Sequence, residues 1–85
     1  MTLTAEQLQI ASLIDAQMRY LTAAGADDIT IFVEMAEYMP GFKQLMDTST
    51  QGEMDALCQR FPKFFRYAKI LERVAEGIHL GEIEV

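Results

Sequence analysis

The sequence is poor in the residues that support cross-links and metal chemistry. It has one cysteine, Cys58, one histidine, His79, and no tryptophan. A single cysteine excludes an internal disulfide and favours a reducing compartment, so we expect a cytoplasmic protein. Residues 1–4 also lack the basic flank and the long apolar stretch of a secretion signal.

Long apolar runs are missing as well. No run approaches the roughly 18–20 residues that span a bilayer, so we expect no membrane association. With 85 residues the chain has room for one domain, and a hydrophobic content of 51% is typical of a folded chain rather than a disordered one. A chain of this size buries roughly 60–65% of its unfolded surface, so we expect a homodimer or a tightly bound protein partner.

Helix start and stop signals occur at several points. Thr4 with Gln7, and Thr50 with Glu53, have the spacing of capping boxes that begin helices. Gly25 is suited to the left-handed conformation that ends a helix. Apolar residues between these signals recur mostly at helical spacing. The sequence therefore predicts helices rather than strands.

The predicted fold is all-α, a compact bundle of four helices at about residues 5–23, 28–39, 50–60 and 62–76. Pro40 suits a first helical turn, and we expect an extra short turn near 41–47. Gly77 predicts the end of the last helix, so residues 1–76 form a single domain and 77–85 an extended or mobile tail. Segment 28–39 is apolar on most of its circumference, which is typical of a helix that is central or shared between subunits.

Positive charge is scarce and unevenly placed. Seven Lys and Arg residues stand against thirteen Asp and Glu residues, for a net charge of −6. Five of the seven cations lie between Arg60 and Arg73, interleaved with aromatic residues. On the predicted helix 62–76, Arg66, Lys69 and Arg73 form a basic ridge opposite the apolar stripe. The acidic balance argues against phosphate-backbone binding, so we do not expect a nucleic-acid partner.

Patterns that indicate catalysis are weak. Glu76 and His79 have the Glu-x-x-His spacing of di-iron bundles, but Gly77 between them predicts that the helix ends first. Cys58 follows Leu57 on an apolar face, where it is expected to pack as a small hydrophobe. We therefore predict no enzymatic activity, no cofactor and no metal site.

The methionines have two interpretations. Methionine-rich faces can form adaptable binding grooves, but most of the methionines here occur at core spacing and are expected to fill the interior. The residues concerned are Met18, Met35, Met39, Met46 and Met54.

The leading hypothesis is a small non-enzymatic protein-interaction or regulatory protein that acts as a homodimer or binds a protein partner. The candidate interface residues are Leu13, Tyr20, Ile31, Tyr38 and Phe65. Three alternatives remain open. The protein can be a DNA-binding regulator that uses the basic helix 62–76 in a helix-turn-helix, a metal-binding helical oxidoreductase, or an acidic inhibitor that mimics nucleic acid. The last alternative would use Asp27, Asp28, Glu34 and Glu37.

Overall fold

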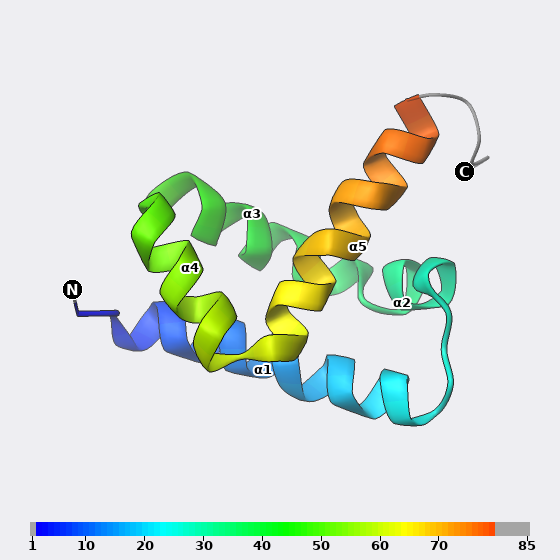
Figure 1. The fold of residues 1–85 in the computed structure, drawn as a ribbon, viewed down its shortest axis with the longest axis horizontal. Coiled ribbons are helices and arrows are strands. Elements are labelled where there is room, and N and C mark those ends of the chain that lie inside the picture. The colour runs from blue at the N-terminus through cyan, green and yellow to red at the C-terminus, as the bar shows by residue number, and fades with distance from the viewer. Residues whose placement is uncertain (1, 80–85) are drawn as a thin grey trace.

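The computed structural model describes residues 2–79, and within them it contains helices and no strand (Figure 1). The helices are α1 (Ala5–Ala23), α2 (Asp28–Glu34), α3 (Met39–Thr48), α4 (Gln51–Arg60) and α5 (Pro62–His79), with a 3-10 turn, η1 (Ala36–Tyr38), between α2 and α3. The predicted all-α class is confirmed, although the described residues form five α-helices rather than four and a turn. None of these helices has the length and apolarity to cross a membrane.

The predicted helix signals act as expected. In the first capping box, Thr4 Oγ1 accepts the Gln7 N–H at 3.1 Å, and Gln7 Oε1 accepts the Thr4 N–H at 2.7 Å. The second box, between Thr50 and Glu53, has the matching distances of 3.1 and 2.8 Å. At the end of α1, Gly25 has φ +81°, a conformation that costs a glycine little. Helix α1 therefore has the bounds that its sequence predicts.

The two capping boxes are connected through one buried side chain. Gln7 Nε2 donates to Ser49 Oγ at 3.0 Å and to Glu53 Oε2 at 3.3 Å. Hydrogen bonds from the Thr50 backbone and from Gln7 lower the pKa of Glu53, because both stabilise its carboxylate. The start of α1 is therefore tied to the corner between α3 and α4.

The prediction of one helix over 28–39 is wrong. Helix α2 ends at Glu34, and Met35 leaves helical geometry with φ −104° and ψ 18°. The Met35 side chain is fully buried, and its carbonyl oxygen accepts the Tyr67 hydroxyl at 3.1 Å. Pro40 lies in the first turn of α3, where its missing N–H leaves no hydrogen bond broken. The chain therefore turns at Met35, and α3 spans ten residues instead of a short turn near 41–47.

The predicted end of the last helix at residue 76 is also wrong. Helix α5 continues through Gly77 to His79. A glycine inside a helix costs roughly 0.5–1 kcal/mol relative to alanine, which a long packed helix tolerates. Of the predicted tail 77–85, Gly77–His79 is helical and 80–85 lies outside the described residues.

The core lies where α5 crosses α1 (Figure 1). Phe64, Tyr67 and Val74 of α5 are buried, as are Ile14 and Met18 of α1. This apolar stripe on α5 follows the 3,4 spacing of its sequence.

A buried aromatic side chain of α3 reaches this core. The Phe42 ring centroid lies 5.6 Å from those of Phe64 and Tyr67, and it meets the Tyr67 ring edge-on at 89°. Close by, Gly41 brings α3 near α1, because a Cβ at this position would lie 3.4 Å from Ile10 Cγ2. Helix α3 is therefore fixed to both long helices at one point.

Asp15 of α1 caps the start of α5. Its side chain is buried, its Oδ1 accepts the Lys63 backbone N–H at 2.9 Å, and its Oδ2 lies 3.1 Å from Arg19 Nε. The residue before α5 is Phe61, which has no side-chain acceptor for the first N–H groups of the helix. A carboxylate from another helix therefore supplies the missing cap.

Replacing Asp15 with alanine is expected to lower the free energy of unfolding by about 1–2 kcal/mol, because an N-cap acceptor is lost. Urea unfolding followed by circular dichroism measures this change. Arg19→Ala is the control: Arg19 is exposed, and its loss is expected to cost about 0–1 kcal/mol. Equal effects of the two substitutions would contradict a capping role for Asp15.

Replacing Tyr67 with phenylalanine is expected to cost about 0.5–1.5 kcal/mol, because the Met35 carbonyl loses the hydroxyl and keeps the Tyr38 N–H at 3.0 Å as its donor. Burial also raises the pKa of Tyr67 to about 12. The unfolded phenol ionises near pH ~10, so the folded state retains an extra proton between these values and stability falls as pH rises through them. Urea titrations from neutral to alkaline pH check both effects.

The Tyr67→Phe variant has no phenol at this position, so it should not show this loss of stability as the pH rises from about 10 to about 12. The control is Tyr20→Phe, since Tyr20 is 68% exposed and its hydroxyl has no buried partner to lose. An unchanged alkaline profile in Tyr67→Phe would contradict the raised pKa of the buried Tyr67 phenol.

Candidate functional site

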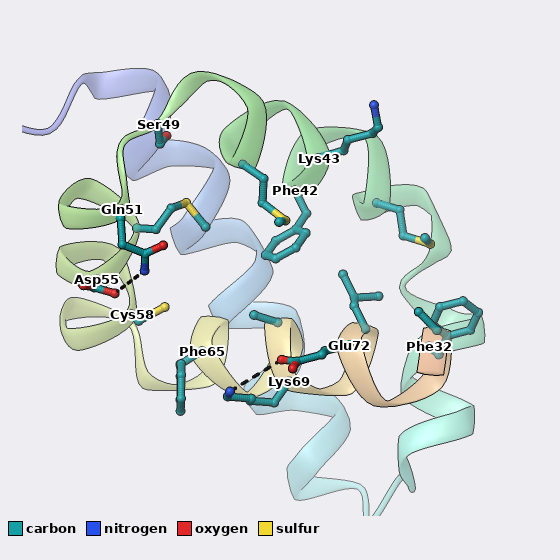
Figure 2. A pocket seen from close by; sticks show the side chains of 16 residues that line it. Phe32, Phe42, Lys43, Ser49, Gln51, Asp55, Cys58, Phe65, Lys69 and Glu72 are labelled. Atoms are coloured by element: carbon teal, nitrogen blue, oxygen red, sulfur yellow. Dashed lines mark hydrogen bonds and ion pairs between the residues drawn. The ribbon is translucent and has the colours of Figure 1, made fainter. Parts of the chain in front are cut away.

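An open apolar groove lies between α3, α4 and α5 and has a volume of about 810 Å³ (Figure 2). Three phenylalanines line it, namely Phe32, Phe42 and Phe65. Three methionines also line it, namely Met39, Met46 and Met54. The volume is within the range of pockets that bind ligands or the side chains of a partner.

The groove is open because the facing side chains do not fill the space between α3 and α5. Both helices pack on α1, and Phe42 joins them at the floor. Beyond Phe42, α5 presents the short side chains of Ala68 and Ala75 to the groove. Met46 and Phe65 remain 57% and 47% exposed on the two walls. Large apolar surface is therefore accessible at a recess, which is typical of interaction sites.

Charged residues at the groove are balanced in sign. Among the described residues that line it, four are charged: Lys43, Asp55, Lys69 and Glu72. Lys69 Nζ lies 3.6 Å from Glu72 Oε2 and 5.4 Å from the centroid of the Phe65 ring (Figure 2). The lining therefore carries no net charge, although the whole chain carries −6.

The predicted basic ridge is engaged within the molecule. Arg73 Nη1 donates to Asp28 Oδ2 at 2.6 Å, and Arg66 Nη2 lies 3.7 Å from Asp28 Oδ1. Arg66 Nη1 also donates to Thr22 Oγ1 at 3.0 Å. Together with the Lys69 pair, these contacts give every residue of the ridge a partner. The ridge therefore attaches α2 and the end of α1 to α5.

Two of the other four cations are neutralised as well. Arg19 pairs with Asp15, and Lys43 pairs with Asp47 at 3.4 Å. Within residues 2–79, Arg60 and Lys63 are the two cations without a carboxylate partner. These two residues provide little free positive charge for a phosphate backbone.

The predicted interface residues have different surroundings. Phe65 lines the groove, whereas Leu13 and Tyr20 are exposed on α1 and do not line it. Ile31 has no exposed surface and belongs to the core, so its expected place at an interface is corrected: α2 turns this residue toward α5. Tyr38 is half-buried and packs against the core.

Most of the five methionines were expected to fill the interior, and the structure divides them between the core and the groove. The groove residues are Met39, Met46 and Met54, whereas Met18 and Met35 are fully buried. The sequence contains a signal for this, because Met39, Phe42 and Met46 recur at i, i+3 and i+7 on one face of α3.

The surroundings of Cys58 disfavour the thiolate form that a catalytic cysteine uses. Burial, and then the Asp55 carboxylate, raise the pKa of the Cys58 thiol, which lowers its thiolate fraction at neutral pH. Among the side chains that the structure describes, no three from His, Cys, Asp or Glu residues come together as a metal site would require. The Glu-x-x-His pattern of Glu76 and His79 depends on the His79 side chain, which is not among them.

No protein-family model, curated protein or solved structure matches the chain. The groove and its surrounding charges are therefore the basis for assigning a function.

The Cys58 thiol is expected to react slowly with a disulfide reagent at pH 7, because its thiolate is disfavoured and its side chain is partly buried. The measurement compares the reaction rate of the folded protein with that of the same protein unfolded in urea. A folded rate equal to or above the unfolded rate would contradict this and would make Cys58 a candidate nucleophile.

Proposed function

We propose that the protein is a small non-enzymatic interaction domain of the cytoplasm that binds an apolar helical segment of a protein in the groove between α3, α4 and α5. The observation that carries the proposal is a recess of about 810 Å³ with a mostly apolar lining, bordered by the exposed side chains of Phe65 and Met46. Amphipathic helices bind proteins by placing their apolar face in a groove of this kind. The single cysteine favours the cytoplasmic location.

The chemistry of the lining supports a protein partner. Methionine side chains are flexible and polarisable, so they adapt to the shape of an inserted side chain. Phe65 is an aromatic residue in a partly covered position, a type that frequently dominates binding energy at protein interfaces.

The charge arrangement favours this function over the DNA-binding alternative. DNA affinity depends on cations that are free to contact phosphates. Arg66 and Arg73 are bound to Asp28, and Lys69 is paired with Glu72. Releasing Arg66 and Arg73 for DNA would break contacts that attach α2 to α5.

The acidic-inhibitor alternative is weakened in the same way. Asp27 Oδ1 accepts the Thr30 N–H at 2.8 Å as the cap of α2, and Asp28 is paired with both arginines. Glu34 and Glu37 are exposed, and two carboxylates form a small surface for mimicking a nucleic acid. The raised pKa of Cys58 weakens an enzymatic alternative based on that thiol.

Photo-crosslinking inside cells tests the proposed function. A photoreactive phenylalanine placed at Phe65 or at Met46 is expected to crosslink a protein partner, because both positions border the groove. The same residue placed at Tyr20 is the control, since Tyr20 is an exposed aromatic on α1 outside the groove. Bands excised from a gel and identified by mass spectrometry give the result.

A second variant makes the test specific. Phe65→Asp is expected to reduce crosslinking from Met46 at least about tenfold, because a charge in an apolar interface is poorly solvated. Tyr20→Asp should leave that crosslinking unchanged. Crosslinks from Tyr20 that equal those from the groove, or none from either groove position, would rule out the proposed site.

A further inference from the structure

We infer that the occupant of the groove is a second copy of this chain, so that the protein is a homodimer joined groove to groove. This rests on the proposed function, because it identifies the partner of the same groove. A two-fold interface uses one patch on both copies, so that patch must fit itself in shape and in charge. The side chains that line the groove bear on both requirements.

The groove contains both a recess and projecting side chains. Its floor is apolar around Phe42, and Phe65 of α5 borders it (Figure 2). Phe65 and Met46 of α3 are both exposed to solvent. A two-fold axis across the groove places the Phe65 ring of each copy against the recess of the other. Each copy then supplies one aromatic anchor and receives one, which is the arrangement that a self-complementary interface needs.

The charges at the groove also fit a second copy. The lining has two cations, Lys43 and Lys69, and two anions, Asp55 and Glu72. Lys69 is paired with Glu72 and Lys43 with Asp47 within the chain, so a second copy meets no excess of either sign at the groove. A basic partner, which a net charge of −6 would attract, finds no net negative charge in this lining.

Association through the groove also keeps the acidic surfaces apart. Glu34 and Glu37 are exposed on α2 and η1 and do not line the groove. Two copies that meet at the uncharged lining therefore avoid bringing these carboxylates into direct contact. The apolar walls, including Met39, Met46 and Phe65, are removed from water at the same time.

Light scattering on the purified full chain over a wide range of concentration is the first test. The expected mass at high concentration is twice the 9.6 kDa of one chain. Phe65→Asp and Met46→Asp are each expected to raise the dimer dissociation constant at least about tenfold, with an unchanged circular dichroism spectrum. Tyr20→Asp is the matched control and should remain dimeric.

Methionine methyl NMR locates the interface. Copies carrying ¹³C-methyl methionine are mixed with unlabelled copies, and only intermolecular contacts are recorded. Contacts are expected at the groove methyls of Met39, Met46 and Met54. The buried methyls of Met18 and Met35 should show none, which makes them internal controls.

Two results would overturn the inference. One is a monomeric mass at every concentration, whether the groove then receives another protein or residues 80–85 of its own chain. The other is a dimer that survives Phe65→Asp or that shows no contacts at the groove methyls. A monomer whose groove crosslinks a different protein rejects the homodimer but retains the proposed function, whereas a groove that crosslinks nothing rejects both.

Discussion

The position of the Phe42 ring determines much of this structure. It packs against both Phe64 and Tyr67, so α3 is held to α5 at one point while both helices lie on α1. Away from that point the facing residues of α5 include Ala68 and Ala75, whose side chains are too short to reach α3. The groove therefore follows from the placement of large and small side chains around one aromatic contact.

Local signals in the sequence predicted much of the fold. The capping boxes at Thr4 and Thr50 and the end of α1 at Gly25 depend on residues three or four positions apart, so a helix template captures them. The extent of α2 could not be predicted in this way. It depends on the bond from Tyr67 to the Met35 carbonyl, and these residues are 32 positions apart. Apolar residues cover most of the circumference of segment 28–39, and this pattern does not indicate where the chain turns.

At the candidate site too, local sequence patterns predicted some features, and contacts between distant residues determine the others. Phe65 was named from the sequence as a candidate interface residue, and it is exposed and borders the groove. The partner of Arg73 was not predictable, because Asp28 lies 45 positions away and belongs to another helix. The groove itself depends on the spacing between α3 and α5, which no local pattern encodes. Sequence periodicity therefore identified one wall of the site and not the space between its walls.

The hydrogen bond from Gln7 to Glu53 has a consequence for how the molecule opens. The first turn of a helix normally frays independently of the rest. Here the Gln7 side chain caps its own helix and also contacts the carboxylate that caps α4, although the two residues are 46 positions apart. Fraying at the start of α1 therefore removes a contact from the start of α4, and the two helix ends are expected to exchange their amide hydrogens together. The first residues of α1 belong to the same cooperative unit as the corner between α3 and α4.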